Sequence, residues 1–449
     1  MKHSLIIFTI LFFTINLFAQ DKIENNEILQ FSLIQAREYA LEHNINVLNS
    51  KLDYDIAKGK VWETTAVGLP QINSSIAYNN YLDIATQLLP GEIFGMPGSQ
   101  IEVQFGTKHN SNIGITASQL IFSGEYIVGL QAAKIYKKLS EQNINKSEYD
   151  VTELVTRTYY LVLMANENKK IVEASLKNTL SILEEMRKTH ELGFVESSDV
   201  DQLELTYQNL QNTISTIDRQ IDLTYNMLKI QLGVKNNQQI ELTDNIQDLL
   251  NVVDIDNLIS QKFVLEDNID YRLFSTQKTL SKLELKRQKS MFLPTLSAFF
   301  THQQNAMRDE FNFFNSGEKW FPTTIIGMNI NIPIFGSGMK LSKVQQAKLA
   351  LLKTQNTLGQ VTENLELGIM QAKSDMSTAN DKYLNEKANL ELSEKIYNNY
   401  LVKFKKGIAS SIELTQAQNQ NLSTKSNYIS AMVEMLNAKN ALDKAMGNY

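Results

Sequence analysis

The sequence of 449 residues has a formal net charge of −6, 43% hydrophobic residues and no cysteine. A chain of this length is able to bury several cores and commonly divides into roughly two or three domains. The lack of cysteine excludes disulfides, thiolate metal sites and lipid attachment through an N-terminal cysteine. The lack of a basic stripe argues against nucleic acid as a partner.

Residues 1–19, MKHSLIIFTILFFTINLFA, have the features of a secretory signal peptide. A basic start is followed by a long apolar stretch and a small residue, Ala19, so we expect cleavage before Gln20. A retained membrane anchor is the alternative. No later stretch approaches about 20 continuous apolar residues, so the sequence predicts no other transmembrane helix.

Two segments around the proline clusters predict β-hairpins, at about 71–122 and about 295–335. Segments 112–118 (NIGITAS) and 325–334 (IIGMNINIPI) alternate apolar residues with polar residues or glycine, which predicts strands with one apolar face. Weaker candidates, 71–82 and 295–303, complete four strands. The first hairpin has the longer loop, because it holds the turn-rich LPGEIFGMPGS. An ordinary half-buried antiparallel sheet is the alternative.

A very long helix is predicted after each hairpin. Residues 130–192 contain neither glycine nor proline, and residues 339–406 contain only two glycines. As continuous helices they would span roughly 95 and 100 Å. Apolar residues recur at spacings of three and four, as at Val172, Leu176 and Leu180. Helices of this length predict coiled coils or a tube of packed helices.

The sequence also repeats internally. LEHNI (41–45) matches LEDNI (265–269) at an offset of 224 residues, and after the hairpins the offset is 214, as for Gly124 and Gly338. A period of about 200 residues indicates two copies of one large unit rather than a solenoid. We predict a first repeat at 20–235, an equatorial connector at 236–255 and a second repeat at 256–449, each repeat reading helix, hairpin, long helix, tight turn and returning helix.

This order of elements resembles the TolC-like outer membrane efflux proteins, over essentially all of the mature chain. Segment 31–72 is similar to the family's opening helix, whose Leu-Pro enters the first strand. The phrases IFSG and PIFGSG are similar to its strand-to-helix crossings. The segments GFVESSDVDQLE (193–204) and GIASSIELTQAQ (407–418) resemble its two helix-turn-helix tips.

The resemblance implies a mainly α fold with a membrane β-barrel: long antiparallel helices form a periplasmic tube, and four strands per subunit complete a 12-stranded barrel in a homotrimer. It implies the outer membrane channel of a tripartite export system in a Gram-negative bacterium, which works with a periplasmic adaptor and an inner-membrane pump. Such a passive duct serves the efflux of small molecules or type I secretion. Strand pairing points the same way, because four strands alone leave unpaired edges in lipid and closed barrels begin at about eight strands.

Glycines stand at each predicted crossing from barrel to tube. Gly124, and Gly336 with Gly338, are expected to let the backbone change direction where a β-carbon would clash. Ordinary loop glycines are the alternative at these positions.

The two tips are marked by glycine and serine. Gly193 and Gly407 each end a long helix, where a left-handed cap is expected. Ser197 and Ser411 begin the returning helices, where hydroxyl groups cap free N–H groups. In the family these tips form the periplasmic entrance and meet the adaptor protein.

The resemblance also implies an acidic aperture at the entrance. Family members often carry Asp six residues after the tip glycine; here Asp199 and Glu413 stand there, and helix capping is the alternative role. Where some members carry a second Asp, this chain has Gln416. The Arg and Tyr that help to close well-studied members are replaced by Ala409 and Phe404, which puts the salt-bridged closure in doubt.

The sequence gives little support to catalysis. No nucleophile elbow or P-loop occurs, and no cofactor or metal is predicted. The histidines are scattered without metal-binding spacing: His3, His43, His109, His190 and His302. A secreted or surface-associated coiled-coil interaction protein without a pore is the alternative function.

Overall fold

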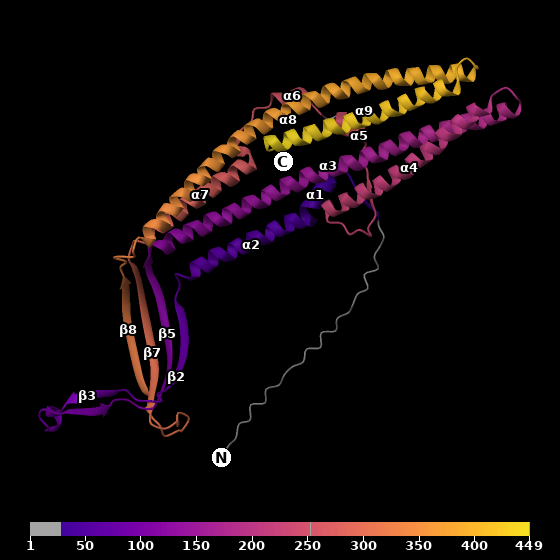
Figure 1. Cartoon of the computed structure of the whole chain (residues 1–449). Helices are drawn as coiled ribbons and strands as arrows, with labels where there is room; N and C mark the ends of the chain where they lie inside the picture. Colours follow the sequence, from indigo (N-terminus) through magenta and orange to yellow (C-terminus); the bar gives the residue numbers. More distant parts are fainter. Residues whose placement is uncertain (1–27, 252, 449) are drawn as a thin grey trace.

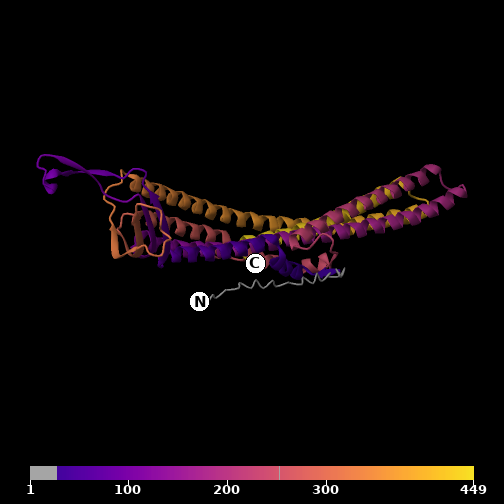
Figure 2. The same ribbon diagram turned by 90° about the horizontal axis from the view of Figure 1, so that it is seen from below.

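The computed structural model describes residues 28–251 and 253–448, and the predicted signal peptide lies outside the described residues. This part of the chain is mainly helical and elongated, with a sheet at one end of long helices (Figures 1 and 2). The helices are α1 (Leu33–His43), α2 (Ile45–Ala66), α3 (Gly124–Glu191), α4 (Ser197–Leu232), α5 (Ile246–Asn251), α6 (Ile255–Ser260), α7 (Ile269–Ser290), α8 (Met339–Lys405) and α9 (Ser411–Met446). The strands are β1 (Leu29–Phe31), β2 (Gln71–Asn80), β3 (Thr86–Pro90), β4 (Gln100–Gln104), β5 (His109–Ser123), β6 (Ile240–Leu242), β7 (Thr295–Arg308) and β8 (Phe321–Asn331).

The two long helices are confirmed. Helices α3 and α8 have 68 and 67 residues, and the helices that return from them, α4 and α9, have 36 residues each. Helix α3 begins six residues before the predicted segment, directly after strand β5. Its N-cap is Ser123, whose hydroxyl accepts a hydrogen bond from the Tyr126 N–H at 3.2 Å.

The expectation of one opening helix over 31–72 is wrong. The segment divides into α1 and α2 at Asn44, which has an extended backbone and is buried. Its side chain accepts from the Asn46 N–H at 2.8 Å and donates to the Gln231 carbonyl on α4 at 2.6 Å. Asn268 caps α7 in the same way and donates to the Ala445 carbonyl on α9 at 3.4 Å. The asparagines of LEHNI and LEDNI are therefore caps that also anchor a neighbouring helix.

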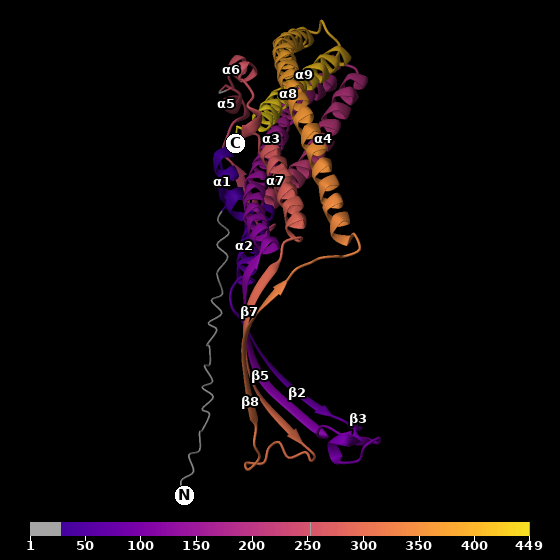
Figure 3. The same ribbon diagram turned by 90° about the vertical axis from the view of Figure 1, so that its left-hand side faces the viewer.

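The four predicted strands form one antiparallel sheet in the order β2-β5-β7-β8 (Figure 1), which extends away from one end of the helices (Figure 3). Helices next to the sheet follow the same order, since α2 packs on α3, α3 on α7 and α7 on α8. Farther from the sheet, the hairpins α3–α4 and α8–α9 contact each other through α3 and α9.

Two small sheets were not predicted. Strands β3 and β4 form a hairpin within the long first loop, at the end of the main sheet that is remote from the helices (Figure 1). Strand β1 pairs in parallel with β6, which ties the start of the described chain to the segment between α4 and α7. That connecting segment continues through α5 and α6, so α7 begins at Ile269.

The largest apolar core lies at mid-length, where α1, α3, α4 and α9 meet β1 and β6. Its fully buried members include Tyr159, Leu228, Leu232 and Leu436. The Tyr159 hydroxyl donates within 3.0 Å of the Phe31 carbonyl and of the Asp244 carboxylate, so a buried polar group is satisfied there. Within the described residues, no helix is both long and apolar enough to cross a bilayer.

Candidate functional site

The turns that join α3 to α4 and α8 to α9 form two adjacent tips. Gly193 and Gly407 have φ angles of +77° and +70°, which confirms the predicted left-handed caps. Their N–H groups donate to His190 and Phe404 carbonyls, both at 2.8 Å. Glycine is needed for this backbone conformation and not for space, because a β-carbon at either position would meet no atom within 4 Å.

The cap of α9 is Ser410, and the expectation that Ser411 caps this helix is wrong. The Ser410 hydroxyl accepts from the Glu413 N–H at 3.3 Å, and the Glu413 carboxylate accepts from the Ser410 N–H at 2.8 Å, which is a capping box. Hydrogen bonds from the Ser410 N–H and hydroxyl hold the pKa of the Glu413 carboxyl below its ordinary value. In the other tip the N-cap is Glu196, without a side-chain cap, and Ser197 is the exposed first residue of α4.

Ser411 instead joins the two tips. It is buried, and its hydroxyl donates to the carboxylate of Asp199 on α4. Asp199 is half-buried, whereas Glu413 is exposed and bound to its own cap. The two carboxylates predicted to line an aperture therefore have different surroundings, because only Asp199 takes part in a contact between the tips.

A small apolar core lies behind the tips. Leu183, Leu203 and Leu414 are fully buried there, and Phe404 packs against the cluster. Apolar side chains also remain exposed at the ends of the tips: Leu192, Phe194, Ile408 and Ile412. Exposed apolar groups at adjacent turns are typical of a surface that meets a partner.

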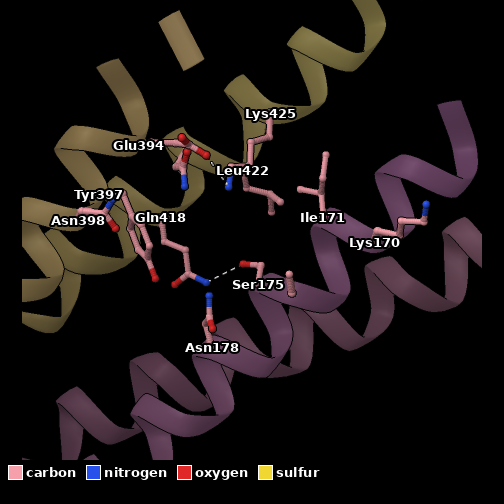
Figure 4. Close-up of a pocket in the computed structure, with 12 residues that line it drawn as sticks. Lys170, Ile171, Ser175, Asn178, Glu394, Tyr397, Asn398, Gln418, Leu422 and Lys425 are labelled. Atoms are coloured by element: carbon pink, nitrogen blue, oxygen red, sulfur yellow. Dashed lines mark hydrogen bonds and ion pairs between the residues drawn. The ribbon is translucent and has the colours of Figure 1, made fainter. Parts of the chain in front are cut away.

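Above this core a polar layer joins the two helical hairpins (Figure 4). Gln418 on α9 donates to the Ser175 and Thr179 hydroxyls on α3 at 2.8 and 2.6 Å. Within the second hairpin, the Ser393 hydroxyl on α8 donates to the side-chain amide oxygen of Asn421 on α9 at 3.3 Å. The layer borders a cavity of about 450 Å³. Sequence reasoning missed it, although Gln418 and Asn421 follow the buried Leu414 at spacings of four and seven residues, on the same face of α9.

The three junction glycines have different roles. A β-carbon on Gly124 would lie 2.7 Å from Leu293, so glycine allows α3 to start close to the end of α7. Gly338 is the N-cap of α8 and has a φ of +79°. At Gly336 a β-carbon would meet no atom within 4 Å, so neither space nor conformation requires glycine there.

The register of the main sheet assigns its side chains to two faces, since residues paired across strands share a face. One side, the apolar face, carries Ile72, Ile76, Ile113, Ile115, Phe300, Ile326, Met328 and Ile330. The other side, the polar face, carries Asn73, Ser75, Asn112, Thr116, Thr301, Gln303, Asn305, Thr323 and Asn329. The predicted alternation is therefore confirmed across all four strands, although β8 ends at Asn331, before Ile332 and Ile334.

Comparison with known proteins identifies a family and several solved structures that are similar to this chain. The family model described as outer membrane efflux protein matches residues 36–234 and 282–448. The CmeC outer membrane channel of Campylobacter jejuni is similar, with 18% identity, a TM-score of 0.73 and coverage of 92% of this chain and 85% of that chain. The outer membrane protein VceC of Vibrio cholerae has 14% identity, a TM-score of 0.72 and coverage of 92% and 96%. The open state of the MtrE outer membrane channel of Neisseria gonorrhoeae has 15% identity, a TM-score of 0.69 and coverage of 92% and 88%. No curated protein sequence matches the chain.

Proposed function

Because the chain belongs to the outer membrane efflux protein family and is thus an outer membrane efflux duct that extends into the periplasm, we propose that three copies of it form the exit duct of a tripartite export system. The four-stranded sheets of the three copies would close one 12-stranded barrel, and the long helices would continue it as a tube. The alternative of a secreted coiled-coil protein without a pore has no support from the comparisons.

The observation that carries this proposal is the matching order of strands and helices. Strands β2 and β8 lie at the two edges of the main sheet, and α2 and α8 lie at the two ends of the helix layer. An edge strand in lipid leaves backbone groups unpaired at a cost of several kcal/mol each. Pairing β2 of one copy with β8 of the next removes these edges and brings α2 against α8 at the same time.

Exposed apolar residues on the outer helices support this arrangement. Helix α2 exposes Leu48, Leu52 and Ile56 at spacings of four residues, and α8 exposes Leu341, Leu349 and Leu352. Single exposed apolar residues are ordinary, but rows of them on both outer helices are typical of a surface that another copy covers.

The orientation of the barrel follows from the two faces of the sheet. We propose that the apolar face contacts lipid and the polar face lines the lumen, as in known membrane barrels. The tips then lie at the periplasmic end, where Gly193, Ser197 and Gly407 would meet the adaptor, with Ser411 holding the two tips together. Asp199 and Glu413 would present up to six carboxylates around the entrance of a trimer.

We also infer that the chain consists of two copies of one unit. The equal lengths of α4 and α9, 36 residues each, and of α2 and α7, 22 residues each, support this inference. So do the equivalent caps Asn44 and Asn268.

Assembly is tested by measuring the mass of the detergent-solubilised protein and recording its conductance in planar bilayers. We expect a particle of three chains with both sheet and dominant helix signals, and discrete channel openings. A monodisperse monomer with intact strands would contradict the proposal. Purifying the complex from cells and identifying the co-purifying pump tests the partners.

A further inference from the structure

The polar face of the main sheet carries no ionisable side chain. Strands β2, β5, β7 and β8 contain no Asp, Glu or Lys, and their titratable side chains are Tyr78, His109, His302 and Arg308. The register places all four on the apolar face: His302 pairs with Ile115, and Arg308 pairs with His109, which in turn pairs with Asn80 on the side of Tyr78. Only amide, hydroxyl, glycine and apolar side chains remain on the polar face.

Arg308 and His302 on the apolar face already have partners. Arg308 is buried, bonds the Glu318 carboxylate and donates to the Lys319 carbonyl at 3.2 Å, at the end of the sheet remote from the helices. His302 lies with its Nδ1 2.8 Å from the Thr324 hydroxyl. These contacts hold the side chains on their own side of the sheet, so they do not bring charge to the polar face.

Amide and hydroxyl groups on the polar face bond one another across three strands. Asn112 on β5 donates to Gln303 and Asn305 on β7 at 2.9 and 2.7 Å. Asn305 donates onward to the Thr323 hydroxyl on β8 at 3.1 Å. This amide ladder fixes the side chains against the sheet and leaves further donors and acceptors for a solute.

Two glycines on the polar face leave room for larger side chains of the neighbouring strand. A β-carbon on Gly327 would come 2.8 Å from the ring of Phe299, and one on Gly114 would come 3.2 Å from Gln303. The ring of Phe299 therefore lies over Gly327 of the neighbouring strand rather than standing out from the sheet, and Gly114 allows close approach of the Gln303 β-carbon.

Taking the proposed trimeric barrel as given, we infer that the wall of its lumen, within the outer membrane, is uncharged and offers hydrogen-bond donors and acceptors. This section of the duct does not select cargo by the sign of its charge. Uncharged polar molecules, cations and anions therefore meet the same wall of amides and hydroxyls. Any preference for one sign of charge arises outside this section, from the helical tube, the tip carboxylates or the outer loops.

The absence of native cysteine permits a direct measurement of the local potential. Ser75 and Ser297 lie on the polar face, and Ser74, the neighbour of Ser75, lies on the apolar face. We would make Ser75→Cys, Ser297→Cys and Ser74→Cys in the full chain, reconstitute each trimer, and compare the modification rates of a cationic and an anionic methanethiosulfonate reagent. The ratio of the two rates, divided by the ratio for a free thiol in solution, reports the sign and size of the potential at that cysteine.

We expect both reagents to modify Ser75→Cys and Ser297→Cys, with a normalised ratio within about twofold of one and little changed by salt, and neither to modify Ser74→Cys. Fixed charge would give a potential of several kT and would change the ratio severalfold in a salt-dependent way, which would overturn the inference. Modification of Ser74→Cys instead of Ser75→Cys would show that the apolar face lines the lumen, which would also overturn the inference. Loss of the trimer in the unmutated protein would contradict the proposed function itself, which the mass measurement shows separately.

Discussion

At the scale of single residues, the tips depend on backbone conformation and on hydrogen bonds that span one turn of helix. Gly193 and Gly407 have positive φ angles, and Ser410 and Glu413 bond each other as a capping box. Both features were predictable in kind, since glycine after a long helix and serine before the next follow from local chemistry. The position of the cap, Ser410 instead of Ser411, depends on where the backbone turns.

Gly407→Ala is expected to destabilise the protein by about 1 kcal/mol, because an L-residue is strained at its φ of +70°. Gly359→Ala is the matched control: it lies within α8 with open space around it, and it should stabilise by about 0.5–1 kcal/mol. Thermal unfolding followed by circular dichroism measures both changes. Equal shifts in the same direction would show that the turn does not need glycine.

The first turn of α9 is expected to loosen in acid. The lowered pKa of Glu413 means that its carboxylate stabilises the folded tip above the ordinary value of 4.5, and this contribution is lost as the pH falls through the lowered pKa. Amide hydrogen exchange of residues 411–414 measures the effect. Glu413→Gln keeps the capping box without the charge, so its exchange, corrected for the intrinsic pH dependence, should not change over this range.

At the scale of elements, the strands of the main sheet place apolar side chains on one face and polar side chains on the other. The alternation along each strand was predictable because side chains of a strand point to opposite faces. The agreement of faces between strands was not, because it depends on register. The amide ladder of Asn112, Gln303 and Asn305 appears only when β5 and β7 are aligned.

Ile330→Arg is expected to impair assembly, whereas the neighbouring Asn329→Arg should be tolerated. Ile330 lies on the apolar face that we assign to lipid, one residue before the end of β8, where an arginine costs less than the roughly 2–4 kcal/mol expected at the midplane. Asn329 lies on the polar face, where a charge remains hydrated and should change conductance. The yield of trimer in the outer membrane measures the difference. Equal losses at both positions would mean that the assigned faces are wrong.

At the scale of the whole molecule, the contacts between the two tips bear on how the entrance closes. Ser411 on α9 bonds Asp199 on α4, and the apolar core around Leu183, Leu203 and Leu414 packs behind them. Phe404 contributes to this core. The two tips of one chain are therefore held together by packing and by this hydrogen bond, and we propose that closure of the entrance rests on such contacts rather than on an arginine at position 409.

The double variant Asp199→Asn with Glu413→Gln is expected to reduce cation preference without producing a permanently open pore. Carboxylates around a constriction favour cations, and both amide replacements keep the size and the acceptor oxygen of the original side chain. Single-channel recordings under a salt gradient measure the permeability ratio and the open probability. Unchanged ion selectivity would reduce both residues to a structural role in the tips.

The long helices, the four strands of the main sheet and the turns at the tips could be predicted from the sequence alone. Segments without glycine or proline propagate as helix, alternation selects strands, and glycine permits positive φ, so each of these depends on neighbours along the chain. It also supplied the family, since the order of these local features is what resembles it.

Which distant residues meet could be learned only from the folded structure. The break at Asn44 requires the Gln231 carbonyl, the link between the tips requires Ser411 to reach Asp199, and the polar layer requires Gln418 to reach Ser175. These partners are separated by 187, 212 and 243 residues in sequence. Hydrogen bonds act over about 3 Å, so such contacts exist only after packing has brought the helices together, and no local pattern specifies them.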